Sequence, residues 1–349
     1  MSVSNEMSLY FVSFVFLWLN ALFPPRSGIA MNALVLSEKF GSSDEKTQLC
    51  VSYSMGAGHL EPFYLNASQL RKGFSAGLSS GGANTAFFCA AQAILFSIIS
   101  AEKDLTSLLK EIDYYLLLLE TYKNELGKKF ILCYRETVAT LIDKGETTGI
   151  EAKLSLRDVE ACDIGQGNKL QEAFYFQEMF RNYWIGYTER CRHYVEKYSS
   201  IVNKGHIFNF NIKFYYGLNL LDAIKKKKNY SKSVEVDEII ASMKIAASHA
   251  ETNFRNKLEL LEAEKFGITA LHKSAGVFQA YDKSIISAQK AGFLHEQGLA
   301  CEKAGLYCKR MKDNERSLSY LNQALDCYEK WGSSVKVEFI RKELGKLHL

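Results

Sequence analysis

The sequence predicts an all-α protein, in which antiparallel helical hairpins stack into an α-solenoid. Only three prolines occur, at positions 24, 25 and 62, so almost the whole chain lacks the residue that most reliably breaks helices. Apolar residues recur at helical spacing, and short polar or glycine-containing segments separate these runs. No alternating strand pattern of convincing length accompanies them. Helices of roughly 12 to 25 residues joined by short turns are typical of helical hairpins.

The segment of residues 1–29 contains a strongly apolar stretch, LYFVSFVFLWLNALF. It is short for a transmembrane span and comparable to the core of a signal peptide. Two interpretations stay open: a buried first helix, or a signal or anchor at residues 8–23 that would make the protein secreted or membrane-tethered. We favour the buried helix, because the preceding MSVSNE contains a glutamate and no lysine or arginine.

Two later segments are the clearest amphipathic helices, each with apolar residues three and four positions apart and a capping candidate in front. The first begins after Asp104 and has its apolar face at Leu105, Leu108, Leu109, Ile112, Leu116 and Leu119. The second begins after Asp313 and Asn314 and has its apolar face at Leu318, Leu321, Leu325 and Tyr328.

The composition argues against several classes of partner and compartment. The 43 basic residues nearly balance the 39 acidic ones, and a net charge of +4 gives little reason to expect nucleic acid or an anionic membrane. The eight cysteines are scattered and include no C-x-x-C pair. In a chain of 349 residues they indicate buried, reduced thiols of a cytoplasmic protein rather than a disulfide framework.

Two motifs resemble ligand sites and have simpler explanations. GFSAGLSSGGAN, residues 73–84, lacks the Lys-Ser/Thr of a phosphate loop and follows no strand, so we expect a helix that ends at a glycine-rich turn. Cys191-Arg-His193 and the pair Cys301 and Cys308 are the metal candidates. Neither has the second short-spaced ligand pair that structural zinc requires, and we expect no metal and no cofactor.

Two further stretches, one rich in lysine and one rich in aromatics, could each be a binding site or an ordinary part of the fold. The lysines at 225–228 and Lys232 could meet phosphates or an acidic partner, but a solvated loop is the simpler interpretation. Residues 174–198 are rich in aromatics, which at helical spacing indicate packing between helices rather than a cofactor box. No nucleophile elbow, zinc-protease motif or obvious nucleophile–base pair appears, so we predict that the protein is not an enzyme and has no catalytic residues.

The segment GLACEKAGLYC, residues 298–308, predicts a helix with a small-residue face. Gly298, Cys301, Gly305 and Cys308 are spaced 3, 4 and 3 apart and therefore share one side of a helix. Two glycines inside a helix cost roughly 1 kcal/mol each relative to alanine, and close approach of a neighbouring helix would offset that cost.

These residues carry a resemblance to the tetratricopeptide repeat. Gly305, Ser317, Leu321 and Ala324 lie at the offsets at which that repeat places its small and large packing residues, although Cys301 and Cys308 stand at its customary Trp and Tyr positions. Residues 280–337, with the closing Trp331-Gly332, resemble the last repeats of large multidomain signalling ATPases. In that family a kinase-like domain and a P-loop ATPase precede the repeats, and sensor or histidine-kinase modules often follow them. No Walker motif or kinase signature is present here.

The sequence predicts a soft boundary near Asn203–Gly205, between an N-terminal helical-repeat segment, residues 1–204, and tetratricopeptide-like repeats at residues 205–349 that continue it. The resemblance implies a non-catalytic interaction or regulatory module that binds a protein or peptide on a concave helical surface, with an ATPase or kinase domain as one candidate partner. The alternatives are an orphan enzyme with a site assembled from distant helices, and a membrane-tethered or secreted helical-repeat protein.

Overall fold

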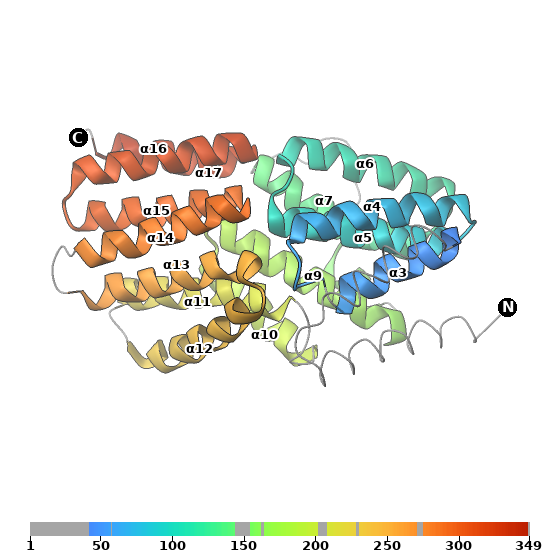
Figure 1. Ribbon diagram of the computed structural model, residues 1–349, viewed down its shortest axis with the longest axis horizontal. Coiled ribbons are helices and arrows are strands. Elements are labelled where there is room, and N and C mark those ends of the chain that lie inside the picture. Colours follow the sequence, from blue (N-terminus) through green and yellow to red (C-terminus); the bar gives the residue numbers. More distant parts are fainter. Residues whose placement is uncertain are drawn as a thin grey trace. The chain divides into compact units, whose positions relative to one another are not determined.

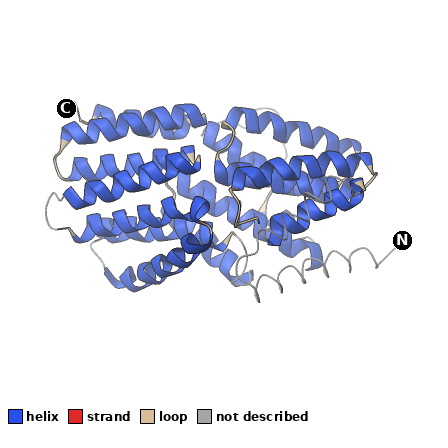
Figure 2. Ribbon diagram, viewed as in Figure 1, coloured by secondary structure: helices blue, strands red, loops and turns tan. Residues whose placement is uncertain are grey.

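The computed structural model describes residues 42–56, 58–143, 154–161, 164–201, 208–227, 230–270 and 275–347. The expected helix in residues 1–29 and the expected boundary at Asn203–Gly205 lie outside the described residues. All regular elements within the described ranges are helices, which confirms the predicted all-α class (Figure 2). Contacts divide the chain into two compact units, Met1–Ile99 with Ile112–Ile131, and Ser100–Glu111 with Leu132–Leu349. We call them the first and the second unit.

The first unit contains α3 (Ser43–Gly56), α4 (Phe63–Ser79), α5 (Ala83–Ser100) and parts of α6 (Leu105–Thr121) and α7 (Glu125–Ile142). Glycines let its helices approach closely. A Cβ added to Gly73 would lie 2.9 Å from Cys50 Cβ, and one added to Gly77 would lie 2.8 Å from Ala86 Cβ. The segment 73–84 therefore packs α4 against α3 and α5 and then turns at Gly81, whose φ is +81°. The helix-and-turn interpretation of this segment is confirmed.

Helix α6 confirms the first predicted amphipathic helix. Its apolar face is buried except at the half-buried Leu109. Asp104 Oδ1 accepts a hydrogen bond of 2.9 Å from the backbone N–H of Ser107, as an N-cap should. Hydrogen bonds from Ser107 lower the pKa of Asp104, because they favour its charged form.

The second unit consists of helices that pack mainly against their neighbours in the chain (Figure 1). Partners pair as α9 with α10, α11 with α12, α13 with α14, and α15 with α16, while α17 packs on α16. Contacts of α11 with α13 and of α13 with α15 link successive pairs. The bounds are α8 Leu156–Glu160, α9 Ile164–Trp184, α10 Thr188–Ile201, α11 Asn209–Lys227, α12 Ser233–His249, α13 Glu251–Thr269, α14 Ala275–Ala291, α15 Leu294–Arg310, α16 Asn314–Trp331 and α17 Ser334–Gly345, with a 3₁₀ turn at Tyr230–Lys232. The grouping places α9 and α10 with the later helices.

Two glycines of α15 let α16 approach closely in the hairpin of these two helices. A Cβ on Gly298 would lie 2.8 Å from the Tyr328 ring, and one on Gly305 would lie 2.7 Å from Leu321 Cγ. Ser317 Oγ donates a hydrogen bond of 2.9 Å to the carbonyl of Gly305. The buried stripe of α16 runs through Ser317, Leu321, Ala324, Cys327, Tyr328 and Trp331. Leu318 and Leu325, expected on this face, are only half-buried, whereas Leu321 and Tyr328 pack directly on the glycines of α15.

Candidate functional site

Helices α13 and α15, which we call the inner helices of the second unit, bury several charged side chains. Helix α15 is enclosed on nearly all sides, and its buried residues include His295, Glu296, Glu302 and Lys303. Helix α13 contributes the fully buried Lys257 and Glu264. Buried charges are rare and costly unless they are paired and hydrogen-bonded, so each of these groups needs an identified partner.

The first group centres on Glu296. Lys257 Nζ lies 2.8 Å from Glu296 Oε2, and both side chains are at most 1% exposed. The Glu296 carboxylate also accepts hydrogen bonds from Asn256 Nδ2 at 2.6 Å and from the Tyr215 hydroxyl at 3.2 Å. Burial lowers the pKa of Lys257 more than Glu296 raises it. The pair thus joins α11, α13 and α15 at one buried carboxylate.

The second group centres on Asp222 and Glu264. Lys303 Nζ lies 2.7 Å from Asp222 Oδ2, and Lys225 is paired with both carboxylates. The Tyr281 hydroxyl donates a hydrogen bond of 2.5 Å to Glu264 Oε1. Burial raises the pKa of Asp222, but the ammonium groups of Lys303 and Lys225 outweigh it and lower that pKa to about 2.

The third group is the pair of Lys336 and Glu302. Their charged atoms are 2.6 Å apart, and the Tyr328 hydroxyl donates a hydrogen bond of 2.7 Å to Glu302 Oε2. The Lys336 ammonium also lies 5.7 Å from the Trp184 ring centroid. Each of the three groups combines carboxylate, lysine and tyrosine side chains, and the second group has two carboxylates and two lysines. We call them together the buried ion network.

The end of α9 covers part of this network. Trp184 is buried, with ring centroids 4.9 Å from Trp331 and 5.5 Å from His295. The hydroxyl of the preceding Tyr183 is buried, and the nearby Lys303 lowers its pKa while burial raises it to well above the usual range. Burial and Lys257 lower the pKa of His295 well below 6.5, so its imidazole is neutral at physiological pH. The charges of the network are therefore matched inside the second unit.

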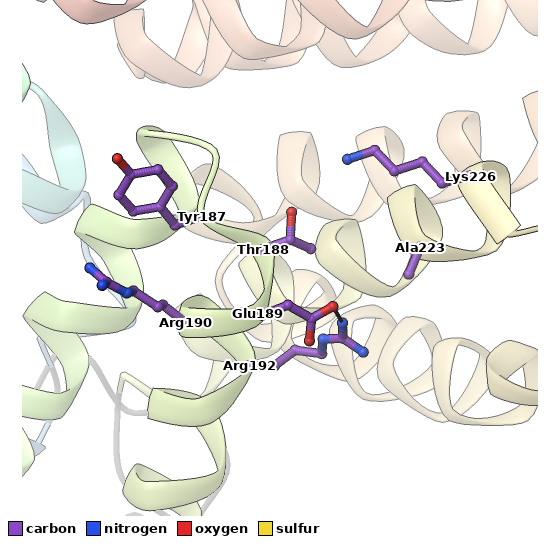
Figure 3. A pocket seen from close by; sticks show the side chains of 7 residues that line it. All are labelled: Tyr187, Thr188, Glu189, Arg190, Arg192, Ala223 and Lys226. Atoms are coloured by element: carbon purple, nitrogen blue, oxygen red, sulfur yellow. Dashed lines mark hydrogen bonds and ion pairs between the residues drawn. The ribbon is translucent and has the colours of Figure 1, made fainter.

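A second, open site lies between α10 and α11 (Figure 3). It is a cavity of about 500 Å³ lined by Tyr187, Thr188, Glu189, Arg190, Arg192, Ala223 and Lys226. We call it the basic pocket. Glu189 is paired with Arg192, so the lining keeps two further cations, Arg190 and Lys226, for which the described part of the chain supplies no carboxylate. Arg190 lies with its guanidinium 5.5 Å from the Tyr187 ring centroid.

A cavity of similar size between α12, α13 and α14 provides a contrast. It is lined by residues that include Lys244, Lys265 and Lys283. Each of these lysines is paired with a carboxylate, respectively of Glu262, Asp237 and Glu259. Cations in the basic pocket are therefore available to a ligand in a way that cations of this second cavity are not.

The lysines of the cluster at 225–228 and 232 lie in different surroundings. Lys225 belongs to the buried ion network, Lys226 lines the basic pocket, and Lys232 Nζ lies 3.1 Å from Glu235 Oε2. The side chains at 227 and 228 lie outside the described residues. The expectation of a solvated loop was wrong for Lys225, because α11 continues to Lys227 and turns that side chain toward Glu264.

Most of the metal and aromatic candidates lie in packed interiors, whereas His193 and Tyr187 are exposed. Cys191, Cys301 and Cys308 are buried free thiols, and burial raises the pKa of Cys191 to about 12. Within the described ranges, no group of three His, Cys, Asp or Glu residues is placed to hold a metal ion. Phe174, Phe176, Phe180 and Trp184 are buried and in contact with other rings, which confirms the packing interpretation of residues 174–198.

Sequence reasoning missed the basic pocket and the buried ion network. Arg190 and Lys226 are far apart in the chain, and only the pairing of α9, α10 and α11 brings them to one cavity. The network had a weak signal: the charged residues of α15 at 296, 302 and 303 interrupt an otherwise apolar and small-residue helix.

Comparison with models of protein families found no matching family, and comparison with curated proteins found no matching relative. One described helix, α5, is long and apolar enough to cross a membrane by length and composition, with a mean hydropathy of 1.5. The protein buries 72% of that helix, and a buried core helix passes the same test of length and composition.

Proposed function

We propose that the chain is a non-catalytic helical-repeat protein that binds a partner protein. In this proposal its paired helices form a tetratricopeptide-like α-solenoid, and its role is regulatory, as in the repeat region of the signalling ATPases that its sequence resembles. The observation that carries the proposal is the distribution of charge in the second unit. Ionisable groups of the inner helices are matched with one another, whereas Arg190 and Lys226 of the basic pocket have no carboxylate partner in the described part of the chain.

This distribution suits binding better than catalysis. Catalytic acids and bases need pKa values near the working pH, and they must be able to reach a substrate. The tyrosines of the buried ion network have pKa values raised well above 10 by burial and by the carboxylates that they contact, and His295 is buried and neutral. Stacked helices joined in this way are the usual scaffold of protein-interaction modules.

The test is affinity capture with the purified full chain, followed by reconstitution with the purified partner. We expect one partner to rebind saturably, and we expect no ATP hydrolysis by the chain itself. A matched control bait is the chain denatured and recaptured under the same conditions. ATP turnover that a point mutation in this chain abolishes would contradict the proposal, as would the absence of any partner that rebinds.

A further inference from the structure

We infer that the basic pocket binds a short acidic peptide segment of the partner protein, in which carboxylates flank an apolar side chain. The inference rests on the proposed function and names the site and the partner chemistry for it. The pocket lies between the first turn of α10 and the last part of α11, and its residues come from the second unit alone (Figure 3).

The charge of the lining selects an anionic occupant. The lining contains three cations, Arg190, Arg192 and Lys226, and one carboxylate, that of Glu189. Its net charge is therefore +2. Only Arg192 is engaged by that carboxylate. Its Nε is buried and lacks a hydrogen-bond partner in the described part of the protein, so Glu189 does not satisfy all the donors of Arg192.

The rest of the lining favours a peptide over a small anion. The Tyr187 ring, the Ala223 methyl group and the Thr188 side chain supply contact surface beside the cations. In Figure 3 the Lys226 ammonium and the Thr188 hydroxyl point toward the same open space, and Tyr187 stands on the opposite side from Lys226. A cavity of about 500 Å³ is much larger than one carboxylate fills, and falls in the size range of ordinary ligand sites.

The cavity between α12, α13 and α14 has a different charge arrangement, because each of its lysines is paired with a carboxylate of the second unit. Arg190 and Lys226 lie on opposite sides of the basic pocket, and no carboxylate of the described residues pairs with either (Figure 3). An acidic segment that reaches both side chains would match their charge.

The test is fluorescence anisotropy with the full chain and a fluorescein-labelled peptide of alternating aspartate or glutamate and leucine. A peptide of equal length with asparagine and glutamine in place of the acids is the ligand control. The pocket variant is Arg190→Glu with Lys226→Glu. The matched control is Lys290→Glu with Lys342→Glu, which makes the same charge change at exposed lysines of α14 and α17.

We expect the acidic peptide to bind the wild type and the matched control alike, more weakly as salt is added. We expect the pocket variant to bind it at least roughly tenfold more weakly, and the milder Arg190→Gln with Lys226→Gln to fall between. All variants should melt like the wild type, because the changed side chains are exposed. Equal binding by the pocket variant and the matched control would overturn the inference, as would equal binding of the uncharged peptide or the absence of binding.

The two proposals fail separately. A captured partner that binds the pocket variant as tightly as the wild type would refute the pocket and leave the interaction function standing. ATP turnover that depends on this chain would refute the interaction function, whatever the peptide does.

Discussion

The central helix of the first unit has no charged residue, whereas the inner helices of the second unit bury several charged side chains among their apolar ones. Helix α5 has no charged residue in eighteen positions, and Ile94 and Phe96 are completely buried in it. Helices α13 and α15 of the second unit bury lysines and glutamates that contact one another. Both units use glycines to bring helices together. They differ in the side chains that they bury between those helices.

The difference has an energetic consequence. An apolar interior is specified by shape and volume, and it tolerates exchanges that conserve both. A paired buried charge contributes little net stability as a pair, but loss of one member leaves an uncompensated charge in the interior. The second unit should therefore depend on single side chains far more than the first unit does. Four substitutions test this comparison.

Lys257→Met should have the largest effect. It leaves the Glu296 carboxylate buried without a cation, and we expect the free energy of unfolding to fall by about 3–5 kcal/mol in denaturant titration. Lys244→Met at the exposed pair with Glu262 is the matched control, with an expected change within roughly 0.5 kcal/mol. Equal losses for the two variants would remove the distinction between buried and exposed pairs.

Asp222→Asn should lower stability by roughly 1.5–3 kcal/mol at neutral pH, because the neutral amide no longer pairs with Lys303. The pKa of Asp222 is about 2 in the folded protein and 3.8 ordinarily, so its stabilising charge is fully present above the ordinary value and is lost as the pH falls through about 2. The stability gap between wild type and variant should therefore narrow from pH ~5 to pH ~2. A gap independent of pH would contradict the assigned pairing.

Gly305→Leu should lower stability by about 1–3 kcal/mol or more through overpacking. A Cβ at this position would already lie 2.7 Å from Leu321 Cγ and 3.3 Å from the Leu321 backbone nitrogen, which cannot move freely. Gly345→Leu is the control, because no atom lies within 4 Å of its added Cβ. Thermal melting of the two variants measures the contrast, and an unchanged melting temperature for Gly305→Leu would refute the close packing of α15 on α16.

Ile94→Leu should have the smallest effect, a loss of less than about 1.5 kcal/mol. Ile94 is completely buried in α5, but the exchange conserves volume and apolar character. Urea titration of this variant beside Lys257→Met compares the two interiors directly. A loss at Ile94→Leu as large as that at Lys257→Met would show that the first unit is as sensitive as the second.

The comparison also indicates what the sequence could predict. The helix at 105–121 followed from its apolar spacing and from Asp104, and the close packing of Gly298 and Gly305 was expected from their shared face. These features depend on residues near one another in the chain. The contact of Lys257 with Glu296 and the cavity shared by Arg190 and Lys226 depend on which helices become neighbours. Helical spacing does not contain that information, so the polar interior and the basic pocket emerged only from the structure.

The central claim is that the buried pair of Lys257 and Glu296 is energetically coupled, so that loss of either member strands the charge of the other. A double-mutant cycle of Lys257→Met and Glu296→Gln measures it most directly, through the free energies of unfolding of the two single variants and the double variant. We predict that the double variant loses about 2 kcal/mol less than the sum of the single losses, because each single variant strands a polar partner that the double variant removes. Losses that add to within about 0.5 kcal/mol would contradict the claim.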